Sequence, residues 1–169
     1  EDGPTVDVDL TALGTDIDSD DDGTSLTYTV TGAPAEGSAS ITGGTLTFDP
    51  GTDFQNLALN ETKDVTIQVT ASDTHGATAV NDVVVTVTGT NDAPTITAGF
   101  GAAVEDGPIV SVDLAPLAGD VDSDDTAATL SYAIPGVPSE GSAVFNGSVL
   151  EFNPGSDFQD LAVGETRDV

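Results

Sequence analysis

Two short acidic segments carry the densest set of potential metal ligands in this sequence. They are Asp16-Ile17-Asp18-Ser19-Asp20-Asp21-Asp22 and Asp120-Val121-Asp122-Ser123-Asp124-Asp125. Alternate aspartates can turn several carboxylate oxygens towards one point, and calcium takes about six to eight oxygens at roughly 2.3–2.6 Å. So many carboxylates in one short loop also cost repulsion that an ordinary turn does not need. We therefore predict that both loops bind calcium (Ca2+).

Two other interpretations of these acidic segments compete with a calcium site. An EF-hand loop begins similarly, but no glutamate closes a twelve-residue loop and no helical pattern flanks it. The second alternative is a solvated turn, because aspartate is common in turns. Asp49 and Asp53 are expected to shape a turn, since the second copy has Asn153 in place of Asp49, and metal binding is the alternative for them.

The overall charge excludes several classes of partner. The sequence has thirty Asp and Glu residues, and its only basic residues are Lys63 and Arg167 apart from one neutral histidine, which gives a formal net charge of −28. No basic patch is available for a nucleic acid or an anionic membrane, and no apolar run has the length needed for membrane insertion. Because the sequence contains no cysteine, no disulfide can stabilise its small core. A bound multivalent cation is the remaining way to stabilise the fold.

Other residues that could do chemistry lack the context for it. His75 is the only histidine and lies in a turn, where we expect it to be solvated. No nucleophile context supports Ser-His-Asp catalysis, and without cysteine there is no thiol chemistry. Paired carboxylates could in principle hydrolyse a glycosidic bond, but duplicated acidic loops suit a spacer better. We expect that the protein is not an enzyme.

An internal repeat organises the chain. Residues 1–65 align without a gap to residues 105–169, and 36 of these 65 positions are identical. The period is 104 residues, which is too long for a solenoid unit and suits an independent sandwich domain. The chain therefore holds duplicated modules.

Alternating and β-branched runs predict an all-β protein. Turn residues separate these runs, and no stretch has a useful helical period. This pattern predicts tandem immunoglobulin/cadherin-like Greek-key β-sandwich modules. The expected strands are Thr5–Leu10, Leu26–Val30, Ser38–Ile41, Thr45–Phe48, Asp64–Ala71, Ala77–Thr88, Val110–Leu114, Leu130–Ile134, Ala143–Phe145 and Val149–Phe152.

The module boundaries follow from the repeat. We predict a first module over 1–90 that lacks its N-terminal strand, a linker over 91–94, and a second module over 95–169 that lacks its C-terminal strands. The linker is polar and restricted by Pro94, so it is stiffer than a Gly/Ser tether. Because the sequence starts without methionine, we interpret it as an internal piece. We expect that neither module closes its sandwich alone. The missing strands would come from further parts of the real molecule or from a neighbouring copy.

In these features the chain resembles the cadherin-like (VCBS-type) tandem repeats of giant bacterial RTX adhesins. The resemblance covers essentially the whole period and rests on five elements in the right order. They are the glutamate of Glu-Asp-Gly-Pro, a late acidic motif at Glu61-Thr62-Lys63-Asp64, an aspartate before a glycine turn at Asp73, the linker Asn91-Asp92-Ala93-Pro94, and the Asp-x-Asp of Asp120-Val121-Asp122.

This resemblance implies a calcium site at each junction between successive modules, with ligands from both modules and the linker. Glu1, Glu61, Asp92, Asp120 and Asp122 are expected to share ions, with a carbonyl of Asn91 or Ala93. Asp64, Asp124 and Glu105 are further candidates, and Asp16, Asp18 and Asp73 belong to the preceding junction. The full set of expected ligands is Glu1, Asp16, Asp18, Asp20, Glu61, Asp64, Asp73, Asn91, Asp92, Ala93, Glu105, Asp120, Asp122 and Asp124.

The resemblance also implies a function and a location. The modules would be the extender region of an adhesin on the bacterial cell surface, exported by a type I route, with calcium stiffening the stalk. The partners of each module would be neighbouring repeats of the same chain, and the distal ligand stays unknown. The alternative is a repeat that itself binds carbohydrate, ice or another cell surface. Threonine rows such as Thr27, Thr29 and Thr31 suggest that alternative, although the solvent face of a sheet has the same pattern.

Overall fold

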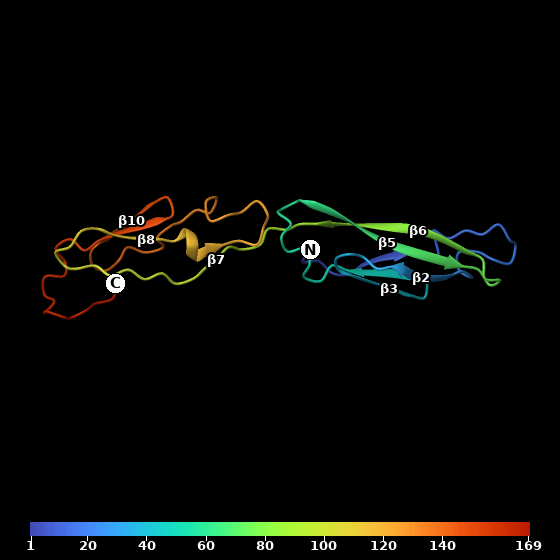
Figure 1. Cartoon of the computed structure of the whole chain (residues 1–169), viewed down its shortest axis with the longest axis horizontal. Helices are drawn as coiled ribbons and strands as arrows, with labels where there is room; N and C mark the ends of the chain where they lie inside the picture. Colours follow the sequence, from blue (N-terminus) through green and yellow to red (C-terminus); the bar gives the residue numbers. More distant parts are fainter. The chain divides into compact units, whose positions relative to one another are not determined.

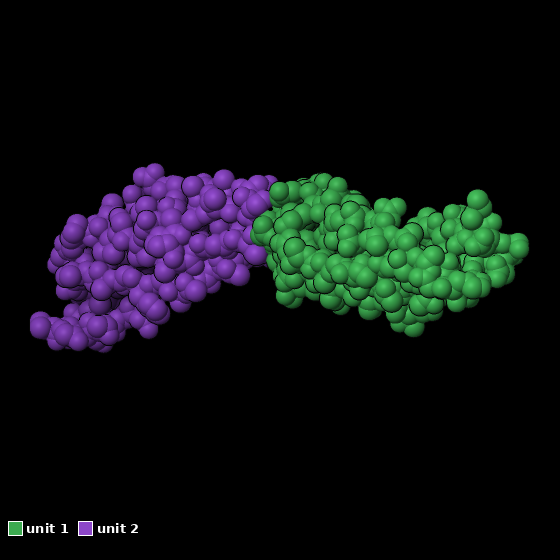
Figure 2. Space-filling model, turned by 45° about the vertical axis from the view of Figure 1, so that its right-hand side comes forward, with its two compact units in different colours: residues 1–92 green, residues 93–169 purple.

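The computed structural model describes all residues from Glu1 to Val169. The chain divides into two compact units, unit 1 over Glu1–Asp92 and unit 2 over Ala93–Val169 (Figures 1 and 2). It contains eleven β-strands and a single 3-10 turn, η1 at Ala115–Leu117. The all-β architecture predicted from the sequence is confirmed.

Unit 1 contains two antiparallel sheets of three strands each. The first has the order β1 (Val6–Asp9), β4 (Thr45–Asp49), β3 (Ser38–Thr42). The second has the order β2 (Thr27–Gly32), β5 (Thr62–Ser72), β6 (Thr78–Thr88). The longest pairing joins β5 to β6, from Thr62 opposite Thr88 to Ser72 opposite Thr78.

The period-two pattern of the strands explains the core between these sheets. Alternate residues of a strand point to opposite faces, so Val65, Ile67 and Val69 of β5 are buried while the residues between them are exposed. They pack with Leu46 and Phe48 of β4 in one hydrophobic cluster, which also contains Phe54. The Phe48 and Phe54 rings meet edge to face with centroids 6.3 Å apart.

Unit 2 repeats the first sheet of unit 1 in the same register. Its order is β10 (Ser142–Asn146), β11 (Val149–Asn153), β8 (Val110–Asp113). Leu150 lies opposite Val112, just as Leu46 lies opposite Val8. A short two-stranded sheet, β7 (Thr95–Ile96) with β9 (Ala118–Gly119), was not expected from the sequence.

The strand expected at Leu130–Ile134 does not form, and this prediction is wrong. In unit 1 the corresponding strand β2 pairs with β5. Only residues 166–169 correspond to the start of β5, and they form no strand. A strand without a partner leaves its backbone groups unpaired, so local β propensity alone does not order it.

The expectation that neither module closes its sandwich alone stays a prediction, although the hydrophobic core of unit 1 is well buried. Leu46 and Ile67 are 0% exposed and Phe48 is 1% exposed, so six strands suffice to enclose this core. Unit 2 differs, because Phe158 is its only hydrophobic residue in the buried core.

The turn before β3 requires a glycine. Gly37 has φ +70° and its counterpart Gly141 has φ +72°. The carboxylate of Asp53 accepts the Gly37 N–H at 2.7 Å, so Asp53 shapes this turn as expected. A Cβ at Gly37 would lie 2.7 Å from the carbonyl oxygen of Asp49 and 2.8 Å from the Phe48 ring.

We therefore expect Gly37→Ala to destabilise unit 1 by roughly 2–4 kcal/mol, the combined cost of a left-handed alanine and a clash with the core. Gly51→Ala is the matched control, since Gly51 also has a positive φ (+58°) but nothing lies within 4 Å of its Cβ position. The control should cost only about 1–2 kcal/mol. Urea midpoints of the two variants measure the difference, and equal midpoints would contradict the packing argument.

Candidate metal sites

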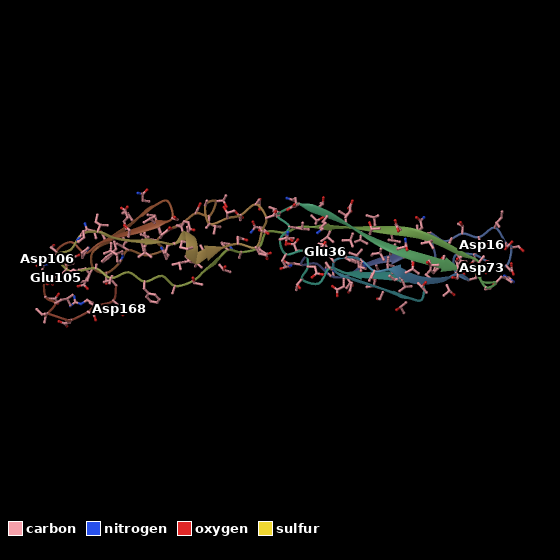
Figure 3. The ribbon with its side chains drawn as sticks, viewed as in Figure 1. Asp16, Glu36, Asp73, Glu105, Asp106 and Asp168 are labelled. Carbon is pink, nitrogen blue, oxygen red and sulfur yellow. The ribbon has the colours of Figure 1, made fainter.

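The acidic loop between β1 and β2 lies beside the turn between β5 and β6. The Thr74 hydroxyl of that turn donates to both carboxylate oxygens of Asp21, at 3.3 and 3.2 Å. Asp16 and Asp73 accordingly lie at the same end of unit 1 (Figure 3). This end therefore gathers carboxylates from two segments that are far apart in the sequence.

Three potential ligands meet at this end of unit 1. Asp20, Asp21 and His75 each offer one ligand atom, and these atoms all lie within 4.8 Å of one another. The Asp21 side chain is fully buried, and the Ser25 hydroxyl also donates to it at 2.9 Å. His75 Nδ1 lies 3.7 Å from Asp21 Oδ2, but the His75 side chain is 70% exposed. The carboxylate oxygens of Asp20 and Asp21 suit a hard cation such as calcium, whereas an imidazole is typically a ligand for transition metals. We therefore consider the two aspartates, and not His75, as the candidate ligands of a hard cation.

Unit 2 holds a second cluster in the corresponding loop. Asp122, Asp124 and Asp125 offer oxygens that all lie within 4.8 Å of one another. Asp122 is only 3% exposed. The donor set consists of carboxylates alone, which is the chemistry that calcium prefers, and it brings three negative charges together. A divalent cation fits this set and would offset the repulsion.

Two aspartates next to the first cluster are held by hydrogen bonds that keep them ionised. Asp73 Oδ1 accepts the N–H groups of His75 and Ala77, each at 2.8 Å. Desolvation by itself raises the pKa of Asp73, but the N–H donors outweigh it and the pKa lies below its ordinary value. The hydroxyl and N–H of Thr24, with the N–H of Ser25, lower the pKa of Asp22 in the same way. Both groups are therefore charged at neutral pH.

The opposite end of unit 1 carries the other predicted ligands. Both carboxylate oxygens of Glu1 accept the Thr90 N–H, at 2.9 and 2.8 Å, and Glu1 is 7% exposed. The N–H of Ala58 donates to Glu61 Oε2 at 3.0 Å. Asp2 accepts a hydrogen bond from the Gln55 amide at 2.8 Å. Glu1 thus ties the first residue of unit 1 to the segment that follows β6.

Unit 2 reproduces part of this end. Gln159 donates to Asp106 at 3.1 Å, and the N–H of Ala162 donates to Glu165 at 3.0 Å, as their counterparts do in unit 1. Glu105, the counterpart of Glu1, differs: its Oε2 is buried and accepts no hydrogen bond. Figure 3 shows Glu105 and Asp106 together at one end of unit 2.

The structure brings some of the predicted ligands together and not others. Asp20 joins one cluster, and Asp122 and Asp124 join the other. Asp16 and Asp120 lie in the same loops but accept the N–H of Asp18 and Asp122. Asp64 lies on the outer face of β5, where the Thr86 hydroxyl donates to it at 2.6 Å.

The remaining predicted ligands lie in the linker and the exposed part of the first loop. The side-chain amide of Asn91 donates a hydrogen bond to the backbone carbonyl of Asp92, and Asp92 is partly buried. Ala93 and Asp18 are both exposed. The sequence analysis missed Asp21 and Asp125 as cluster members. A usable signal existed, because an aspartate stands at this position in both copies of the repeat.

The fold and the duplicated loops define a tandem Ig-like β-sandwich protein. Residues 1–88 match the model of the bacterial Ig domain family, and the chain belongs to this family. No curated protein matches the chain. Ig-like domains are a non-enzymatic fold class, and bacterial Ig domains are typically extracellular or at the cell surface. The chain has no helix with the length and apolar character needed to cross a membrane.

Proposed function

We propose that the chain is a calcium-stabilised structural extender repeat of a bacterial cell-surface adhesin. The observation that supports this function is the placement of acidic groups at both ends of unit 1, with the β5–β6 hairpin between them. Eleven residues per strand at about 3.3 Å each separate these groups by roughly 36 Å. Acidic groups thus lie at both ends of a module, where an array of modules would be joined.

The path of the chain through each unit supports calcium at the junctions. The chain leaves unit 1 beside Glu1, which holds Thr90. It enters unit 2 through β7, where Thr95 pairs with Gly119, next to the acidic loop that starts at Asp120. An ion held by these groups would link successive repeats and stiffen the stalk, as in the cadherin-like RTX adhesin repeats that the chain resembles.

The expected affinity fits export before folding. Extracellular calcium modules bind with dissociation constants of about 10⁻⁴–10⁻³ M, so their sites would be empty in the cytosol and filled outside. A chain that folds only on binding could leave the cell unfolded, which suits a type I secretion route. The threonine rows need no ligand in this proposal: Thr27, Thr29 and Thr31 are exposed on the sheet, and the Thr31 and Thr70 hydroxyls share a hydrogen bond.

The calcium site of unit 2 is tested by Asp122→Asn. We expect this substitution to weaken binding at one site by about tenfold or more, because a buried carboxylate ligand loses its charge. Isothermal titration with calcium gives the affinity and the number of sites. Asp82→Asn is the matched control, since Asp82 is exposed within β6 and outside both clusters. Equal binding by both variants would contradict a site at Asp122.

A further inference from the structure

The turn between β10 and β11 contains the only Asn-Gly pair of the chain, Asn146-Gly147. A residue with a Cβ crowds the backbone nitrogen that follows an asparagine, and proline has no N–H at all. The Gly147 nitrogen is therefore the one that can most easily approach the side-chain amide before it. The other asparagines precede leucine, glutamate, aspartate, aspartate and proline, and they are Asn56, Asn60, Asn81, Asn91 and Asn153.

The geometry of this hairpin leaves the pair accessible. Asn146 pairs with Val149, so Gly147 and Ser148 form a two-residue loop, and Gly147 has φ +64° as such loops require. Asn146 and Gly147 are both exposed, and nothing lies within 4 Å of a Cβ placed on Gly147. In a β-turn the N–H of the second residue takes no part in the closing hydrogen bond. The Gly147 nitrogen is therefore available for a reaction.

Contacts hold the far side of this turn and not the reacting pair. The Ser148 hydroxyl donates to Asp113 Oδ1 at 2.9 Å, and the Ser148 carbonyl accepts the Leu114 N–H at 3.0 Å. No such contact restrains the side-chain amide of Asn146 or the N–H of Gly147. The tips of turns open at low free energy, so the Asn146 side chain can reach the conformation that the reaction needs.

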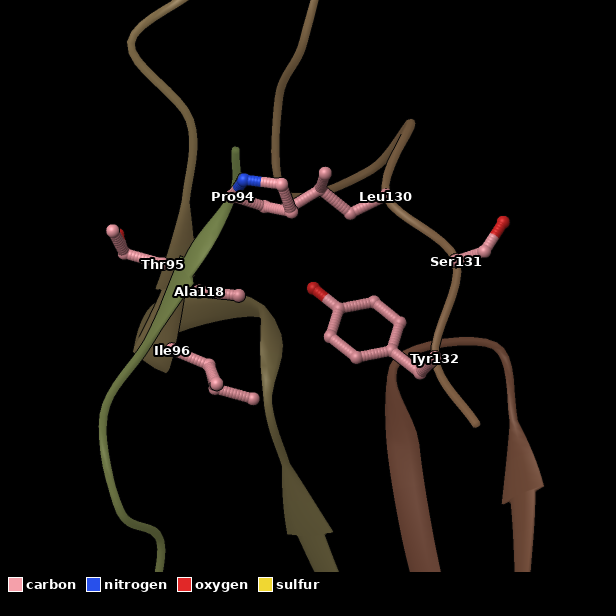
Figure 4. A pocket seen from close by; sticks show the side chains of 7 residues that line it. All are labelled: Pro94, Thr95, Ile96, Ala118, Leu130, Ser131 and Tyr132. Atoms are coloured by element: carbon pink, nitrogen blue, oxygen red, sulfur yellow. The ribbon is translucent and has the colours of Figure 1, made fainter. Parts of the chain in front are cut away.

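We propose that Asn146 is a site of spontaneous deamidation in the folded protein. The Gly147 nitrogen loses its proton and bonds to the side-chain carbonyl carbon of Asn146, whose bond to the amide nitrogen breaks, so that ammonia leaves. Water then opens the cyclic succinimide at either carbonyl and gives aspartate or isoaspartate at position 146. Water reaches this turn directly, because the pair lies outside the largely apolar pocket of unit 2 that Ile96, Leu130 and Tyr132 help to line (Figure 4).

The products alter a turn whose counterpart in unit 1 cannot react. Thr42-Gly43 occupies the same place between β3 and β4, and threonine has no amide to lose. In unit 2, Asn146, Val149 and Asp113 are cross-strand neighbours in one row, so an aspartate at position 146 adds a charge to the face that carries Asp113. Isoaspartate lengthens the backbone and opposes closure of the two-residue loop. This inference goes beyond the proposed function and does not depend on calcium.

Incubation of the full chain at physiological temperature and mildly alkaline pH tests the reaction. Peptide mass spectrometry locates each deamidated asparagine, and an isoaspartate methyltransferase detects isoaspartate. We expect Asn146 to react at least about tenfold faster than the other asparagines, because only Gly147 lacks a Cβ. The rate should rise with pH, since the attacking nitrogen must lose its proton. Asn146→Thr copies Thr42 of unit 1 and is the matched control, which should release no ammonia on this timescale. A rate at Asn146 no higher than that at Asn91 would overturn the proposal.

A free peptide of residues 143–150 separates the effect of the fold from that of the sequence. Because the reacting pair is exposed and unrestrained in the turn, Asn146 in the folded chain should deamidate within about tenfold of the rate in the peptide. A greater retardation would mean that the turn shields Asn146, and it would contradict the assignment of a reactive site in the folded protein.

Hydrogen exchange measures what the reaction does to the hairpin. Chromatography separates the aged chains into unreacted, aspartate and isoaspartate forms. Amides of Val149 and Leu150 should exchange about tenfold faster in the isoaspartate form, with no change in β4, because the longer backbone loosens the turn. The aspartate form should keep the protection of the unreacted chain. Equal protection in the isoaspartate and unreacted forms would refute the predicted loosening.

Discussion

Removal of calcium is expected to lower the melting temperature of this protein by about 6–20 °C for each site that empties. Unit 1 has two clustered aspartates and unit 2 has three, and within each cluster the ligand atoms lie within 4.8 Å of one another. The chain as a whole has a net charge of −28, so a bound cation also reduces repulsion. A cation bound only by the folded state stabilises it by mass action. With dissociation constants of about 10⁻⁴–10⁻³ M, about 10 mM calcium contributes roughly 1.4–2.7 kcal/mol per site.

Differential scanning calorimetry with calcium and with a chelator measures this effect. Ionic strength must be matched with NaCl, because monovalent salt also screens the carboxylates. The same concentration of magnesium is the second control, since magnesium requires a stricter octahedral geometry and keeps its water. A melting temperature that is the same in calcium, magnesium and chelator would contradict the calcium-stabilised fold.

Strand positions and core residues could be predicted from the sequence because they depend on local alternation. Leu46 and Phe48 alternate with threonines in β4, and the repeat shows the same pattern at Leu150 and Phe152. Their inward orientation follows directly from the period of two. The strand expected at Leu130–Ile134 fails for a reason outside that segment, because a strand needs a partner as well as a pattern.

The candidate sites were less predictable because they depend on contacts between distant residues. The burial of Asp21 involves Thr74, which is 53 positions away, and an acidic run alone does not show which aspartate turns inward. The motif predicts Glu1 as a metal ligand, but it could not predict that both its oxygens accept the Thr90 N–H, 89 positions along the chain. A motif indicates the type of donor, whereas the fold decides what the donor binds.

A pair of identical substitutions should have different effects in the two units. Phe48→Ala removes a ring that is 1% exposed and packs against both sheets, so we expect unit 1 to lose about 3–5 kcal/mol. Phe152→Ala removes the same side chain from the same register in unit 2, where the ring is partly exposed and no β5–β6 hairpin covers it. The cost there should be smaller, roughly 1–3 kcal/mol, because part of its surface is already in contact with water.

Native-state hydrogen exchange separates the two costs, because amides of β4 report on unit 1 and amides of β11 report on unit 2. Each variant serves as the control for the other, since substitution in one unit should leave the exchange of the other unit unchanged. The two rings make the same edge-to-face contact, Phe48 with Phe54 at 6.3 Å and Phe152 with Phe158 at 6.2 Å, so this contact cancels in the comparison. What remains is the contribution of the hairpin that covers only unit 1. Equal losses would contradict the packing argument.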